Sequence, residues 1–131
     1  MSPHLENKLV KDFSKLFGDV DKPVTQTLIC FGCECDDGWF TILYELCTEL
    51  TVMAQKEGPE REEVLRFTQI KEKYGELCVY TQGTTDEMQT VIDKAEAKSS
   101  KVCEQCGKKG SIDNNHYWLK TLCPGCKKKR K

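Results

Sequence analysis

Apolar residues recur at helical spacing in three segments of the chain, residues 3–17, 36–58 and 84–100. Apolar positions three and four residues apart lie on one face of a helix, and that face is buried against a core. The middle segment has the longest apolar stripe, and the last begins with a capping box formed by Thr84 and Glu87. The pattern therefore predicts three amphipathic helices.

The pattern between the second and third helices is that of β-strands. Residues 64–82 are rich in β-branched and aromatic side chains and are interrupted at Tyr74-Gly75, which predicts a β-hairpin. Residues 60–63 are expected to form a solvated acidic connector, and residues 25–31 a short strand. The predicted fold class is α+β, with three helices and a β-hairpin.

Four cysteines form the strongest motif of the sequence. Cys103 and Cys106 make one pair and Cys123 and Cys126 a second, with two residues inside each pair and 16 between the pairs. Two residues between cysteines let a tight turn aim both sulfurs at one ion. A hairpin between the pairs then brings all four thiolates to a single tetrahedral zinc ion.

These cysteines predict a small zinc ribbon or treble-clef-like module over residues 101–131, which follows an α+β body over residues 1–100. Its strands are expected at residues 111–112 and 117–122. Zinc supplies the folding free energy that so short a segment lacks. Because four thiolates fill the coordination shell, we expect one structural zinc, with His116 an exposed hairpin residue rather than a ligand.

Charge divides the chain at the same boundary. Residues 1–100 hold 11 Lys and Arg against 19 Asp and Glu, a formal charge of −8, whereas residues 101–131 hold 9 against 2, or +7. Four thiolates on Zn²⁺ lower the second value to about +5. A basic module favours nucleic-acid phosphates, although a lysine-rich end is also common as a solubilising tail. The candidate nucleic-acid or partner contacts are Lys108, Lys109, Tyr117, Lys120, Lys127, Lys128, Lys129, Arg130 and Lys131.

Two aromatic residues of the predicted module have alternative roles. Successive side chains of a strand point to opposite faces, so Tyr117 and Trp118 are expected to face different surroundings. The favoured interpretation is that Trp118 packs the module against the body. The alternative is that Tyr117 stacks on a base or on a partner side chain.

The remaining cysteines give a weaker signal. Cys30, Cys33 and Cys35 lie close together in sequence and are a possible second metal site, but the chain has no matching second pair to complete a tetrahedron. Cys47 lies on the apolar stripe of the middle helix and Cys78 in the hairpin, where a small buried cysteine is ordinary.

An acidic cluster precedes the middle helix. Glu34, Asp36 and Asp37 could bind Mg²⁺ together with Glu72 and Lys73, as in a metal-dependent nuclease. The spacing of the Glu-Lys pair does not match that pattern, and helix capping with favourable placement of negative charge is the preferred interpretation.

Other function classes are disfavoured by the sequence. No stretch of about 18 apolar residues indicates a membrane span, and the first residues lack the features of a signal peptide. The sequence contains neither a Ser/His/Asp arrangement nor a glycine-rich phosphate loop. We therefore expect a non-enzymatic, cytoplasmic protein without a small-molecule substrate.

The chain resembles a family of small bacteriophage and prophage proteins with a C-terminal four-cysteine zinc ribbon. The resemblance covers residues 28–126 and departs from the family pattern at Asp36, where glycine is usual, and at Cys30 and Cys33. It rests on four motifs that occur in a fixed order. The first comprises Phe31-Gly32, Glu34 and Asp37-Gly38-Trp39. The second is residues 69–77, the third is residues 95–99, and the fourth is the two cysteine pairs together with residues 118–122, which precede the second pair. It implies a phage accessory protein in the bacterial host cytoplasm and no specific biochemical activity.

Three functions follow in order of preference. The first is binding of nucleic acid or a nucleoprotein through the basic module. The second is inhibition of a host defence protein, such as a nuclease effector, on which the acidic body would dock. The third is a Mg²⁺-dependent nuclease.

Overall fold

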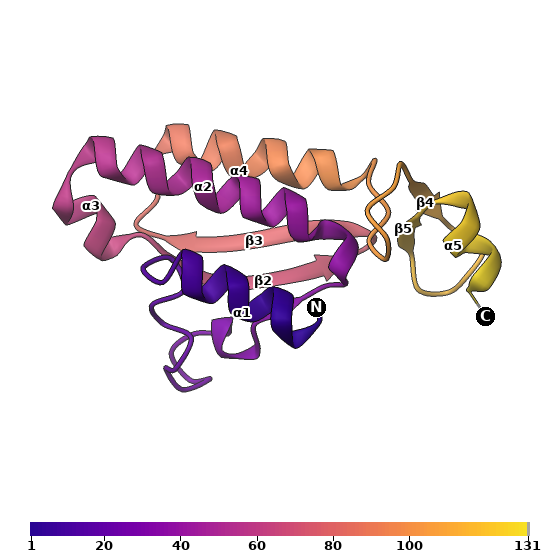
Figure 1. Ribbon diagram of the computed structural model, residues 1–131, viewed down its shortest axis with the longest axis horizontal. Helices are drawn as coiled ribbons and strands as arrows, with labels where there is room; N and C mark the ends of the chain where they lie inside the picture. Colours follow the sequence, from indigo (N-terminus) through magenta and orange to yellow (C-terminus); the bar gives the residue numbers. More distant parts are fainter. Residues whose placement is uncertain (131) are drawn as a thin grey trace.

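A computed structural model describes residues 1–130 of the chain and confirms the α+β class. Helices and a small sheet form the body, and the C-terminal module, residues 101–130, lies at one end of it (Figure 1). The four cysteines of the predicted zinc motif come together in this module.

A three-stranded sheet forms one layer of the body. Strand β2 (Arg66–Lys73) lies in the middle, antiparallel to β3 (Glu76–Gln82) and parallel to the short β1 (Cys33–Glu34). The β2–β3 turn is Tyr74-Gly75, as predicted, and both residues have positive φ, 54° and 84°. Two positive φ values match the right-handed twist of the strands, which explains why a two-residue turn suffices here.

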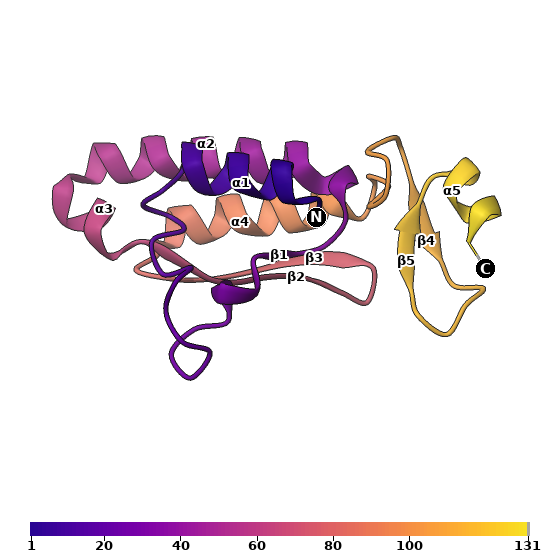
Figure 2. The same cartoon turned by 60° about the horizontal axis from the view of Figure 1, so that its bottom comes forward.

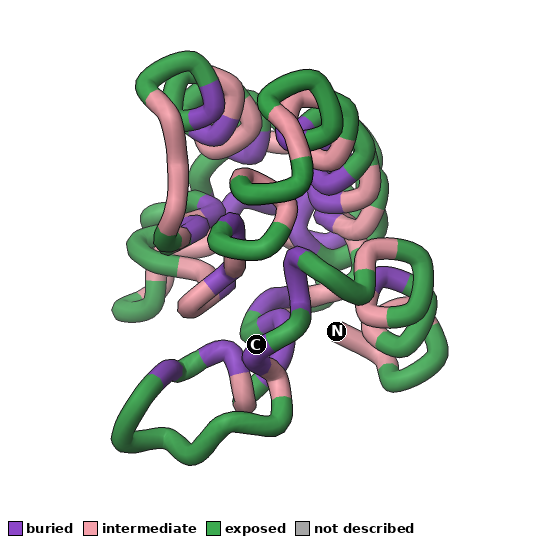
Figure 3. Tube along the Cα trace, turned by 90° about the vertical axis from the view of Figure 1, so that its left-hand side faces the viewer, coloured by how far each residue is buried: buried purple, intermediate pink, exposed green. Residues whose placement is uncertain are grey.

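Helices form the second layer and cover one face of the sheet (Figure 2). They are α1 (Pro3–Asp12), α2 (Phe40–Glu57) and α4 (Asp86–Ser99). Their buried positions face the sheet and their exposed positions face outward (Figure 3). Trp39, just before α2, is fully buried, and the rings of Phe17 and Phe67 pack edge to face with their centroids 5.0 Å apart. Long β2 side chains such as Lys71 and Lys73 lie on the other side of this strand from buried Ile70.

Two predicted elements of the N-terminal region are wrong in extent or type. Helix α1 ends at Asp12 instead of residue 17, because Phe13 has left the helical conformation with φ −127° and ψ 49°. Residues 25–31 form turns and the 3₁₀ helix η1 (Ile29–Phe31) instead of a strand. Leu16, Phe17 and Ile29 of these segments still reach the core, but through irregular backbone whose shape the tertiary packing decides.

Helix boundaries elsewhere differ from the predictions by smaller amounts. The expected connector at residues 60–63 is wrong in type, because these residues lie in a short helix, α3 (Pro59–Val64), which begins at a proline directly after Gly58. A proline suits the first turn of a helix because its missing N–H would have had no partner. The N-cap of α4 is Thr85 instead of Thr84, and its hydroxyl accepts a hydrogen bond from the Met88 N–H at 3.2 Å.

The C-terminal module contains a short hairpin and a helix. Strands β4 (Ser111–Asp113) and β5 (Lys120–Leu122) are antiparallel, and Tyr117 and Trp118 lie in the loop between them instead of in a strand. Helix α5 (Pro124–Lys129) starts within the second cysteine pair, as in a treble clef, so Lys127, Lys128 and Lys129 are helical. Of the predicted tail, Lys131 lies outside the described residues.

The module is held against the body by hydrogen bonds that involve the body's backbone or its buried tryptophan. The Gly38 N–H donates to the Glu104 carbonyl at 2.7 Å, and the Trp39 indole N–H donates to the Val102 carbonyl at 2.9 Å. On the other side, the Thr121 hydroxyl donates to the Gly75 carbonyl at 2.6 Å. One end of the contact therefore lies at the 3₁₀ helix η2 (Asp37–Trp39), and the other at the β2–β3 turn.

Among the described residues, the helices are all too short or too polar to cross a bilayer.

We predict that Gly38→Ala lowers the free energy of unfolding by about 1–3 kcal/mol, measured by urea denaturation. A Cβ at this position would overlap the backbone carbonyls of Cys103 and Glu104, which cannot move without breaking the contact between module and body. Gly125→Ala is the control, because its Cβ would meet nothing closer than the Cys123 sulfur at 3.9 Å. Equal stability of the two variants would contradict the prediction.

Candidate metal centre

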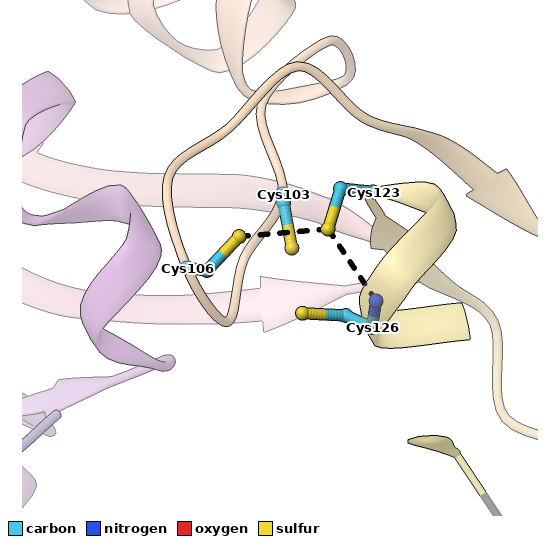
Figure 4. A group of neighbouring side chains, drawn as sticks. All are labelled: Cys103, Cys106, Cys123 and Cys126. Atoms are coloured by element: carbon cyan, nitrogen blue, oxygen red, sulfur yellow. Dashed lines mark hydrogen bonds between the residues drawn. The ribbon is translucent and has the colours of Figure 1, made fainter. Parts of the chain in front are cut away.

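The four cysteines of the sequence motif form a compact sulfur cluster. The Sγ atoms of Cys103, Cys106, Cys123 and Cys126 all lie within 4.8 Å of one another, and those of Cys106 and Cys123 are 3.5 Å apart (Figure 4). Four sulfurs placed tetrahedrally at about 2.3 Å from zinc are about 3.8 Å apart. The cluster therefore has the size that a single metal ion requires.

Local backbone structure positions each pair. In the first, the Cys103 N–H donates to the Lys108 carbonyl at 2.7 Å, and the Gly107 N–H donates to the Cys103 carbonyl at 2.9 Å. Gly107 has φ +85°, a conformation that costs glycine little and other residues more. In the second pair, Cys123 is the N-cap of α5, and its sulfur accepts from the Cys126 N–H at 3.4 Å.

The environment of the sulfurs favours a thiolate at one of them. The hydrogen bond from the Cys126 N–H lowers the pKa of Cys123 to about 6. The Cys126 thiol donates in turn to Cys123, which raises the pKa of Cys126 to about 12. Metal binding needs all four sulfurs deprotonated, so it must release at least the Cys126 proton at neutral pH.

The arrangement leaves no coordination position for a substrate. Four protein ligands complete a tetrahedral shell, which is typical of structural metal sites. His116 is not one of the clustered ligands, since its Nδ1 lies 3.2 Å from the Asp113 carboxylate. His116 is therefore not among the clustered ligands, as predicted, but it is half-buried instead of exposed.

The second candidate metal site is not assembled. Within residues 1–130, the four-cysteine cluster is the only group of three or more potential ligands that converge. Cys33 and Cys35 are buried in the body core, whereas the Cys30 thiol is half-buried and faces the Thr27 carbonyl at 3.6 Å. The close spacing in sequence does not bring the three cysteines together, because Cys30 in η1 lies outside the core that contains Cys33 and Cys35.

The acidic cluster of the nuclease hypothesis is also divided among separate contacts. The Asp36 carboxylate pairs with Lys120 at 3.2 Å, and Asp37 accepts a hydrogen bond from the Ser2 N–H at 2.6 Å. Glu72 accepts from the Gly75 N–H at 2.7 Å and from the Trp118 indole N–H at 3.0 Å. Asp36 is the N-cap residue of the 3₁₀ helix η2 (Asp37–Trp39) and Asp37 lies in its first turn, as the favoured interpretation placed them, but neither makes a side-chain capping bond.

Part of the predicted basic surface is occupied by contacts within the protein. The Arg130 guanidinium pairs with buried Asp113 at 3.1 Å and also donates to the Trp118 carbonyl. The Lys127 ammonium donates to Ser111 at 2.7 Å, and Lys120 pairs with Asp36. Of the lysines predicted as nucleic-acid or partner contacts, those within the described residues that are exposed and have no side-chain ion pair or hydrogen bond are Lys108, Lys109, Lys128 and Lys129.

Two features near the site are not apparent from the sequence. Glu104, inside the first cysteine pair, is buried against the body, and its carboxylate accepts from the Asp36 N–H at 3.0 Å. Burial raises the pKa of this carboxyl group. Lys71 and Tyr74 of the body lie beside Tyr117 and Trp118 of the module and line one groove with them. Only the folded contact between body and module brings these four residues together.

Comparison with known proteins found no match: the chain matches no protein-family model, no curated protein and no solved structure. The resemblance to phage proteins therefore stays a prediction.

We predict that Cys33, Cys35 and Cys47 resist alkylation by iodoacetamide in the folded protein, whereas half-buried Cys30 reacts. Burial raises the pKa of the Cys33 thiol to about 12 and those of Cys35 and Cys47 well above the ordinary value, so all three stay protonated at neutral pH. Mass spectrometry of peptides from the native and the urea-unfolded protein measures the pattern. Rapid native labelling of Cys33 or Cys35 would contradict their burial.

Proposed function

We propose that the four-cysteine cluster binds one structural zinc ion and that the C-terminal module binds nucleic acid or a nucleoprotein. In this proposal the protein acts by binding and is not an enzyme. The size of the sulfur cluster and its all-thiolate donor set favour zinc, since soft sulfur ligands in tetrahedral geometry select it. Four thiolates can also hold iron, and elemental analysis distinguishes iron from zinc.

The distribution of acidic groups supports nucleic-acid binding most strongly. The two acidic residues of the module, Glu104 and Asp113, are each only 3% exposed. Its exposed lysines lie on either side of the first cysteine pair and in α5, so the accessible charge of the module is almost entirely positive. A surface of this kind displaces the counterions of a phosphate backbone without reading the sequence.

The wider context follows from the resemblance in the sequence. A phage accessory protein that acts in the bacterial cytoplasm meets host and phage nucleic acid directly, and its cysteines stay reduced and able to bind zinc.

Docking on a host defence protein is the second candidate. It is supported by an exposed apolar group in the segment before β1, formed by Val24, Leu28 and Phe31. Apolar side chains gathered on one exposed segment are a feature of protein contacts. If this candidate is correct, Phe31→Asp abolishes capture of one defined host protein, whereas the Lys128→Gln, Lys129→Gln variant still captures it.

Elemental analysis of the purified protein is expected to give about one zinc per chain. Cys103→Ser should lose the metal, and Cys30→Ser, the matched control outside the cluster, should retain it. Zinc affinity should fall as the pH is lowered, because protons compete with the metal for the thiolates. A ratio near two would restore the Cys30, Cys33 and Cys35 site, and a ratio near zero would remove the zinc proposal.

Nucleic-acid binding is tested by the salt dependence of the affinity. We expect the double variants Lys108→Gln, Lys109→Gln and Lys128→Gln, Lys129→Gln each to reduce the slope of log K against log salt by about 1.4–1.8. Lys56→Gln, Lys94→Gln removes two exposed lysines of the body and should leave the slope unchanged. Fluorescence anisotropy with labelled oligonucleotides, at several salt concentrations, measures the slope for each variant and for the control. No binding at about 50 mM salt would overturn the proposal, since the electrostatic contribution is large there.

A further inference from the structure

A groove of about 530 Å³ lies where the β2–β3 turn of the body meets the β4–β5 loop of the module. The body contributes the end of β2 and the turn, and the module contributes the loop that contains Tyr117 and Trp118. The groove lining is Lys71, Glu72, Lys73, Tyr74, Tyr117, Trp118 and Leu119. It is therefore formed only when the module is docked on the body.

Three aromatic side chains of this groove are exposed although their rings are large and apolar. Tyr74 is 76% exposed, Trp118 is 61% exposed, and Tyr117 is fully exposed. Each aromatic ring that is left in water forgoes the free energy that burial would provide. Three exposed aromatic rings around one groove form a surface on which the planar groups of a ligand can stack.

Trp118 is held in place despite its exposure. Its indole N–H donates to the Glu72 carboxylate at 3.0 Å, and its carbonyl accepts from the Arg130 guanidinium. Glu72 and Arg130 are themselves fixed, by the Gly75 N–H and by buried Asp113. A ring that is already oriented loses little conformational entropy when a ligand stacks on it.

The groove also carries positive charge. Lys71 and Lys73 lie on the same face of β2, about 7 Å apart at the usual rise of a strand. The Lys73 ammonium is 5.9 Å from the centre of the Tyr74 ring, so charge and stacking surface are adjacent. Glu72, the acidic residue of the lining, has both carboxylate oxygens engaged by N–H groups of the protein, one from Gly75 and one from Trp118.

We propose that this groove binds single-stranded nucleic acid, with bases stacked on Tyr74, Tyr117 and Trp118 and phosphates paired with Lys71 and Lys73. This inference rests on the proposed function and assigns the form of nucleic acid. A duplex covers the faces of its bases by stacking them on one another, whereas a single strand can offer them to aromatic side chains. The lysines of the module supply general attraction to phosphate, and the groove supplies the preference for unpaired bases.

Aromatic grooves also bind proline-rich peptides in extended form. The two lysines at the edge of this groove favour a polyanion over such a peptide, whose own backbone carries no charge. A proline-rich peptide is therefore included in the test as a competing probe.

The test is a comparison of a labelled oligothymidylate, a duplex of equal length and a proline-rich peptide as ligands of the zinc-loaded full chain. Intrinsic fluorescence reports on the groove directly, because Trp118 is exposed and the other tryptophan, Trp39, is completely buried. We expect the oligothymidylate to bind at least about fivefold more tightly than the duplex and to quench Trp118, since one stacked base is worth about 1–3 kcal/mol.

Two substitutions remove stacking surface without removing packing. Tyr117→Ala deletes a fully exposed ring, and Tyr74→Asn deletes a ring while placing a favoured residue in the Tyr74-Gly75 turn. Each should weaken oligothymidylate binding by about 5- to 150-fold and leave duplex binding unchanged. Phe31→Ala, which removes an exposed ring outside the groove, is the matched control and should bind like the unmodified protein.

Different binding results would contradict the single-strand site and the proposed function. Equal binding of oligothymidylate and duplex, unchanged in both groove variants, would overturn the groove as a single-strand site and leave nucleic-acid binding intact. Quenching of Trp118 by the peptide but not by the oligothymidylate would also overturn it. No binding of either nucleic acid would overturn both.

Discussion

The contact of Gly38 with the backbone of the first cysteine pair couples the body to the C-terminal module. The Gly38 N–H donates to the Glu104 carbonyl, and the space beside Gly38 is filled by the carbonyls of Cys103 and Glu104. A glycine is required because any side chain would occupy the position of those carbonyls. Since Cys103 is also part of the four-cysteine cluster, the geometry of the candidate metal centre and the position of the module on the body depend on the same few atoms.

Because of this coupling, a metal bound to the cysteine cluster would also fix the position of the module on the body. A segment of about 30 residues folds poorly without a metal or other support, because it buries too little surface. When the cysteine pairs are held together, Thr121 and Trp118 reach the β2–β3 turn and bond to Gly75 and Glu72. The groove at that turn needs both parts of the chain in place. If the cluster binds a metal as proposed, we expect loss of the metal to weaken both the docking of the module and the proposed single-strand site.

The folded protein leaves fewer basic groups of the module free to contact a ligand than the sequence suggests. The formal charge of residues 101–131 is +7, but several of its basic groups are used internally. Arg130 neutralises buried Asp113 and positions Trp118, and Lys120 pairs with Asp36 of the acidic body. Of these, the Lys120–Asp36 pair joins the basic module to the acidic body. Lys108, Lys109, Lys128 and Lys129 of the module are exposed and have no side-chain partner, so phosphates can reach them.

The sequence by itself determined the features that depend on local spacing. The spacing of the two cysteine pairs specified the sulfur cluster. Apolar residues at helical spacing specified α2 and α4, and the break at Tyr74-Gly75 specified the hairpin turn. Tertiary structure decided what depends on neighbours distant in the chain. Residues 25–31 have strand-like composition, yet they form turns and η1, because local propensity is weak compared with packing. Lys71 and Tyr74 meet Trp118 only because docking brings residues from the body and the module to one groove, and no pattern along the chain encodes that proximity.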